Sequence, residues 1–311
     1  MKMTRTIHGL LICLSMNALS IAAQGQATSD STGLPGDNFS LQGALELFKK
    51  ATSPEEFEKL LNTAENKVNN LDLNEDGQID YIRVINKKEN DVQIFVLQAL
   101  VSDKESQDIA VIELEKTAQD NAVVQIAGDE DIFGVETIIE PGDDDNAYNA
   151  AGSSLASGPN MEPAEYTNDA AIVVNVWAWP CVRFVYAPSY RLWISPWGWA
   201  SRPNWWRPWK PLSWQVYRPI RYRYRPHYVV VHTHRVAYAP RLYRPMRVTS
   251  VTVRTRHQVS VTNYRATRTT RTVTASRNNK QYQATRKTTT VQGPRGNKVS
   301  RTKTTVRKKN R

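Results

Sequence analysis

Acidic residues are missing from the second half of this chain. Residues 171–311 contain no Asp or Glu, although they hold 30 of the 41 Lys and Arg residues. All 30 acidic residues lie before residue 171, so the formal net charge of +11 hides two halves of opposite charge. Such an asymmetry predicts an electrostatic partner for the basic half. This partner is either an external anion or the acidic half of the protein itself.

Cysteine and long apolar runs are also scarce. The apolar run Gly9–Met16 is too short to span a bilayer. It follows Lys2 and Arg5 and precedes small residues around Ala22, which is the order of a secretory signal peptide. We therefore expect an exported protein, located in the periplasm or on the outer cell surface. Its mature chain keeps only Cys181, which excludes an internal disulfide.

Motifs that carry catalysis are missing as well. The sequence has no nucleophile elbow, no phosphate-binding glycine loop and no local Ser/His/Asp arrangement. It therefore predicts a protein that is not an enzyme. His232 and His234 would share one face of a strand, but the surrounding cations and the lack of a nearby carboxylate disfavour a transition-metal site there. We expect exposed histidines in a basic ribbon.

The acidic half predicts an α+β fold of two short helices followed by a four-stranded antiparallel meander. Ser40 can cap the first helix, and the sequence Ser53-Pro54-Glu55-Glu56 is typical of the start of the second. Period-two segments follow at residues 81–86, 92–101, 109–115 and 122–127. The segment 92–101 is apolar on both faces, which indicates a central strand covered by helices on one side and by another layer on the other.

The sharpest motif lies where the second helix gives way to the first strand. It reads D-x-N-x-D-G-x-x-D, and its oxygen donors are Asp72, Asn74, Asp76, the backbone oxygen of Gln78, and Asp80. Oxygen donors at alternate positions can converge on one cation while the glycine permits a sharp turn, and calcium suits this oxygen set. We therefore predict a structural calcium site of modest affinity. The alternative is an acidic turn that binds nothing specific.

This motif resembles two known kinds of calcium loop. It matches EF-hand loops over their first nine positions, but Arg83 stands where an EF-hand has its bidentate Glu, and a strand-like segment follows. It is closer to the D-x-D-x-D-G-x-x-D loops of integrin-type repeats, in which the final acid replaces the distal Glu. By this resemblance Asp80 is the residue that completes the site.

The order of segments resembles a group of secreted proteins from Bacteroidetes-type bacteria. The resemblance rests on two helices, the segments NNLDLNEDGQIDYIRV, QDIAVIELEK and GDEDIFG, and a tryptophan- and proline-rich stretch with a basic end. It covers most of the mature chain. It implies a location in the envelope of a Gram-negative cell, and it implies no activity.

The basic half begins with an aromatic region. All nine tryptophans lie between Trp177 and Trp214, interleaved with Arg and Pro. Proline recurs too often for long helices or strands, so we expect short strands joined by turns. Three interpretations stay open: a packed aromatic domain, a platform for carbohydrate or glycolipid, and a segment at a membrane interface.

The chain ends in a basic low-complexity tail rich in Thr, Arg, Val and Lys. Few large apolar residues offset its charge, so we expect disorder that is lost on binding a partner. The signal peptide argues against nucleic acid and favours anionic envelope polymers such as lipopolysaccharide, with contact to a membrane surface as a further possibility. The predicted segments are signal peptide, flexible lead-in, acidic domain, linker, aromatic region and tail, at residues 1–23, 24–37, 38–140, 141–170, 171–245 and 246–311.

Together these features predict a secreted, non-enzymatic envelope protein. A calcium loop would brace its acidic domain, and its cationic aromatic half would adhere to anionic polymers. One alternative is a glycan-binding accessory module of an enzyme. Another is a structural protein that self-associates through its acidic and basic halves.

Overall fold

The computed structural model describes the backbone of residues 31–142, 173–267, 270–277, 280–292 and 298–308, and side chains up to residue 265. The chain divides into two compact units, residues 1–30 and 31–311, and every described residue belongs to the second. The predicted signal peptide, most of the lead-in and most of the linker lie outside the described residues. No helix in the described part is long and apolar enough to cross a membrane.

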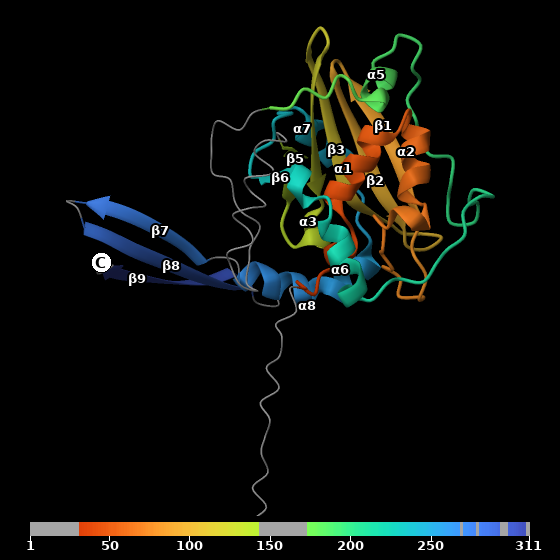
Figure 1. Ribbon diagram of the computed structural model, residues 1–311. Helices are drawn as coiled ribbons and strands as arrows, with labels where there is room; N and C mark the ends of the chain where they lie inside the picture. Colours follow the sequence, from red (N-terminus) through yellow and green to blue (C-terminus); the bar gives the residue numbers. More distant parts are fainter. Residues whose placement is uncertain (1–30, 143–172, 268–269, 278–279, 293–297, 309–311) are drawn as a thin grey trace, which may run out of the picture. The chain divides into compact units, whose positions relative to one another are not determined.

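A six-stranded antiparallel sheet forms the centre of the fold (Figure 1). Its strands follow one another in sequence order: β1 (Ile82–Glu89), β2 (Val92–Leu100), β3 (Ser106–Ala118), β4 (Asn121–Gly128), β5 (Thr137–Pro141) and β6 (Tyr228–Val231). The α+β class is confirmed, but the predicted count of four strands is wrong. The two extra strands are only five and four residues long. β6 comes from the basic half, where the sequence predicts short strands but gives no sign that one of them joins this sheet.

The two predicted helices are present, and their caps explain where they begin. In α1 (Leu41–Lys50) the side chain of Ser40 accepts the N–H of Gly43 at 3.0 Å. In α2 (Pro54–Leu61) the side chain of Ser53 accepts the N–H of Glu56 at 3.2 Å. Each serine satisfies a backbone donor that the first helical turn leaves without a partner.

Short helices connect and cover the strands. Those of the acidic half are η1 (Pro35–Asn38), η2 (Ala64–Asn66) and α3 (Glu130–Phe133). Those of the aromatic region are α5 (Pro180–Val185), α6 (Trp214–Tyr222), η3 (Arg225–His227), α7 (Ala239–Tyr243) and η4 (Arg244–Met246). The aromatic region is therefore built mainly of helical turns and loops, and the expectation of short strands is met only by β6.

Both faces of the sheet are covered, as the apolar pattern of residues 92–101 predicts. On the first face Phe95 packs with α1, α2 and α5, and its ring centroid lies 5.1 Å from that of Phe48. On the second face Val96 belongs to a cluster with Val236 and Leu242 from the segment that contains α7. The second layer is thus supplied by the basic half.

The free edge of β1 is covered by the aromatic region too. Ile194 forms an isolated antiparallel bridge with Ile85, and the N–H of Asn86 donates to the carbonyl of Trp193 at 2.8 Å. Beside this bridge the buried carboxylate of Glu58 accepts hydrogen bonds from Tyr81 at 2.7 Å and Ser195 at 2.7 Å. Covering an edge in this way removes a template for pairing with other chains.

The buried carboxylates of the second face take part of their hydrogen-bond partners from the basic half. Asp108 accepts from the Tyr243 hydroxyl at 3.0 Å and from the Val248 N–H at 2.9 Å. Ion pairs join arginines of residues 221–265 to the acidic half: Arg221 to Asp37, Arg235 to Glu140, Arg247 to Asp129 and Asp131, Arg254 to Asp131, Arg256 to Glu75, and Arg265 to Glu130. Within the described residues, the acidic half is therefore one partner of the basic half.

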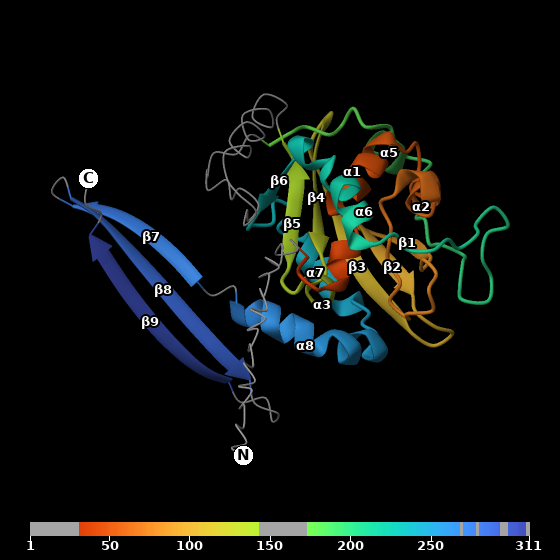
Figure 2. The same cartoon turned by 60° about the horizontal axis from the view of Figure 1, so that its bottom comes forward.

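The predicted tail begins inside this arrangement. Helix α8 (Val251–Thr267) starts where Ser250 accepts the N–H of Val253 at 3.1 Å, and Val253 is fully buried. Helix α8 packs against α3 and leads to β7 (Figure 2). Beyond it the backbone forms a second antiparallel sheet of β7 (Thr270–Arg277), β8 (Lys280–Gln292) and β9 (Lys298–Lys308).

Substitution of Arg247 by alanine tests the contribution of these contacts. The side chain of Asp129 is 2% exposed and lies 2.6 Å from Arg247, so Arg247→Ala leaves a buried charge without its main partner. We expect a loss of about 3 kcal/mol in the free energy of unfolding, measured by chemical denaturation of the full chain.

Arg254→Ala is the matched control, because Arg254 also contacts Asp131 but its side chain is 56% exposed. An exposed pair of this kind is worth about 1 kcal/mol or less. Equal small losses in the two variants would contradict a stabilising role for the buried pair.

Candidate functional site

The predicted calcium loop forms a tight acidic turn between η2 and β1. Asp72 accepts the N–H groups of Asp76 at 3.1 Å and Gly77 at 3.0 Å, and Asp76 accepts that of Gln78 at 2.8 Å. Asn74 also accepts the N–H of Asp76, at 3.1 Å. Gly77 has φ of +81°, a conformation that glycine adopts without strain and that the turn requires.

Asp80 closes the loop from the core side. Its carboxylate is buried and accepts the N–H of Leu73 at 2.6 Å. Burial, together with the charges of Asp72 and Asp76, raises the pKa of Asp80 to about 7, while the hydrogen bond from Leu73 opposes the shift. Three carboxyl groups therefore lie near enough to repel one another when ionised.

The five predicted ligand residues all belong to this loop. Among the described residues, no three Asp, Glu, His or Cys side chains form a ready metal site. Each loop carboxylate instead accepts backbone N–H groups. Because a carboxylate has several lone pairs, these bonds leave oxygens that a cation could still share.

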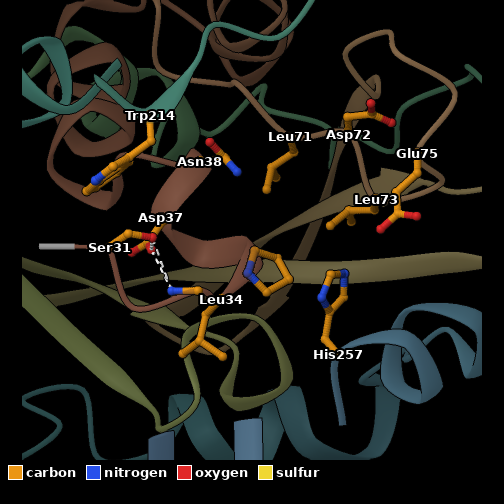
Figure 3. Close-up of a pocket in the computed structure, with 12 residues that line it drawn as sticks. Ser31, Leu34, Asp37, Asn38, Leu71, Asp72, Leu73, Glu75, Trp214 and His257 are labelled. Carbon is orange, nitrogen blue, oxygen red and sulfur yellow. Dashed lines mark hydrogen bonds between the residues drawn. The ribbon is translucent and has the colours of Figure 1, made fainter. Parts of the chain in front are cut away.

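A cavity of about 310 Å³ adjoins this loop (Figure 3). Asp72, Leu73 and Glu75 line it from the loop, and Trp214 and His257 line it from the basic half. Glu75 is paired with Arg256 at 3.3 Å. The cavity therefore lies between the loop and side chains of the basic half.

The charged groups of this cavity already have partners in the protein. Asp37 accepts from the Ser31 hydroxyl at 2.8 Å and the Thr32 N–H at 2.6 Å, and it lies 3.4 Å from Arg221. Burial lowers the pKa of His257, against the opposing charge of Glu75.

His234 is not the exposed histidine that the sequence predicts. Its Nδ1 lies 2.8 Å from Glu113 and its Nε2 lies 3.3 Å from Glu136. These carboxylates come from the acidic half, so folding supplies the nearby acids that the local sequence lacks. The hydrogen bond to Glu113 is the main cause that raises the pKa of His234, and burial opposes it.

The tryptophans divide between core and surface. Trp179 and Trp206 are each 8% exposed, whereas Trp199 and Trp205 are 40% and 45% exposed. The ring of Trp206 packs edge-on against Tyr81, with centroids 5.2 Å apart. The packed interpretation and the surface interpretation of this region therefore each describe part of it.

Stability should fall as pH rises through the folded-state pKa of His234. Because that pKa is raised above 6.5, the folded state favours the protonated ring. The stabilising contribution of the protonated ring is complete below pH 6.5. It is lost as the pH rises through the raised pKa of the folded state. We expect His234→Gln to remove this component from a plot of melting temperature against pH.

His257→Gln is the control, since the pKa of His257 is shifted downward and its effect on stability has the opposite dependence on pH. An unchanged alkaline loss of stability in His234→Gln would show that the pair with Glu113 makes no contribution.

Comparison with protein families, curated proteins and solved structures finds no match to this chain.

Proposed function

We propose that this chain is a secreted, non-enzymatic envelope protein whose basic tail adheres to anionic polymers such as lipopolysaccharide. The observation that carries this proposal is the distribution of charge over the fold. Residues 31–267 hold 25 basic and 29 acidic residues, while residues 268–311 hold 14 basic residues and no acidic ones. Residues 31–267, called the body from here on, are close to neutral. Residues 268–311, the part of the tail beyond α8, have no internal counter-charge.

The backbone register of the tail supports an anionic partner. It places Arg271 opposite Arg286, Arg277 opposite Lys280, and Lys287 opposite Lys303. Like charges directly opposite each other destabilise antiparallel strands. An anionic polymer would offset this repulsion and release its own counter-ions on binding.

A structural calcium site in the loop of residues 72–80 is the second part of the proposal. Its support is the gathering of Asp72, Asp76 and Asp80 around a glycine turn. Asp72, Asn74, Asp76, Asp80 and the backbone oxygen of Gln78 would hold the ion. Bound calcium would neutralise the repulsion between the three carboxylates and so stabilise the turn before β1.

The calcium site is tested by melting the full chain in millimolar calcium and in chelator. We expect a higher melting temperature with calcium, because a ligand that binds only the folded state adds RT ln(1 + [L]/Kd) to stability. Asp76→Ala should abolish this difference. Asp103→Ala removes the same charge from an exposed turn outside the loop and should preserve it. Identical melting of the unchanged protein in both solutions would refute the site.

The tail is tested by the salt dependence of lipopolysaccharide binding. Replacing Arg301, Lys303 and Arg307 with Gln removes three positive charges from β9. We expect weaker binding and a shallower slope of log affinity against log salt concentration, because fewer counter-ions are released.

A matched variant removes three positive charges from the body instead, by changing the exposed residues Arg191, Arg207 and Lys210 to Gln. It should alter the salt slope much less. Equal effects of the two triple variants, or binding that does not depend on salt, would refute adhesion through the tail.

A further inference from the structure

A guanidinium group enclosed by aromatic rings lies at the base of the loop of residues 196–210. The guanidinium carbon of Arg202 is 5.3 Å from the ring centroid of Trp199, 5.4 Å from that of Trp206 and 5.4 Å from that of Tyr81. Tyr81 belongs to the acidic half and is fully buried. This arrangement joins a cation from the loop to a ring fixed in the core.

Two buried hydrogen-bond donors of this cluster have no acceptor among the described residues. They are Nη1 of Arg202 and Nε1 of Trp206. A buried donor without a partner costs free energy, so an oxygen acceptor that reached both atoms would stabilise the cluster. The guanidinium makes an anionic acceptor the favoured one.

The surroundings of these donors favour an oxyanion carried on a ring. Trp199 and Trp205 are the exposed indoles of the loop, and Trp205 also packs near Tyr81, with centroids 6.5 Å apart. Exposed indole faces can stack against the apolar face of a sugar. Of the three rings around Arg202, Trp199 is the most exposed and is therefore the one that can move aside to admit a ligand.

We propose that Tyr81, Trp199, Arg202 and Trp206 form a binding site for an acidic sugar, that is, a sugar ring bearing a carboxylate or a phosphate. The oxyanion accepts from Arg202 and from Nε1 of Trp206, and the sugar ring stacks on the exposed indoles. This site lies in the folded body and does not depend on the basic tail. The site binds a single sugar ring, whereas the tail binds a polymer according to its density of negative charge.

The test is titration of the full chain with small ligands at fixed ionic strength, followed by calorimetry and by tryptophan emission. Glucuronate and glucose 1-phosphate are the acidic sugars, and glucose and inorganic phosphate are the probes that lack one of the two features. Because all nine tryptophans lie in residues 177–214, displacement of the Trp199 ring should change the emission. We expect both acidic sugars to bind more tightly than glucose or phosphate.

Three variants connect this binding to the cluster. Arg202→Gln should weaken the binding of acidic sugars at least about tenfold, because it removes a charge-assisted hydrogen bond. Trp206→Phe keeps an aromatic ring against Tyr81 but removes the Nε1 donor, so a loss of about threefold to tenfold is expected. Lys210→Gln removes an exposed charge from the same loop and should leave the affinity unchanged.

The proposal fails if no acidic sugar binds, or if inorganic phosphate binds as tightly as the sugar phosphate. It also fails if Lys210→Gln weakens binding as much as Arg202→Gln, because general attraction to the basic surface would then explain the result. An emission shift with anionic phospholipid vesicles but not with acidic sugars would assign the loop to membrane contact instead. None of these outcomes bears on adhesion through the tail, which is measured by the salt slope of the β9 variant.

Discussion

The pairing of buried carboxylates with donors from the basic half is the constraint on which the fold depends. Asp108, Glu113 and Glu140 lie on the second face of the sheet and are almost fully buried. Amides of the acidic half reach Asp108 and Glu140, but the hydroxyl, imidazole and guanidinium donors come from residues 234–247. A buried carboxylate without such a donor costs several kcal/mol of stability. The sheet of the acidic half therefore requires residues 234–247 to pack against its second face.

This requirement also limits which parts of the aromatic region are free to contact other molecules. Residues 193–195 cover the edge of β1, and residues 236–246 cover the second face, so these parts are committed to the structure. Among the tryptophans, Trp199 and Trp205 in the loop of residues 196–210 remain exposed. The unpaired donors of Arg202 and Trp206 lie in the same loop, so the proposed sugar site is placed there.

Local patterns predicted the features that local physics determines. The caps at Ser40 and Ser53, the two helices and the strand covered on both faces follow from side chains within a few residues of one another. The sequence could not predict that His234 meets Glu113, or that Ser195 meets Glu58, because these partners are 121 and 137 residues apart and leave no periodic signal. For the acidic loop, the same oxygens suit backbone N–H groups and calcium equally, so the motif alone cannot decide between a turn and a metal site.

The charge balance of the fold favours an external anion over self-association. Many carboxylates of the body are already paired with arginines of the same chain, and a tail from a second molecule would have to replace one ion pair with another. Such an exchange gains little. Over the whole body, 29 acidic residues stand against 25 basic ones, which is too small an excess to neutralise the 14 cations of a second tail. An anionic polymer brings negative charge that residues 268–311 lack, which supports the proposal that this segment binds a foreign surface rather than another copy of the chain.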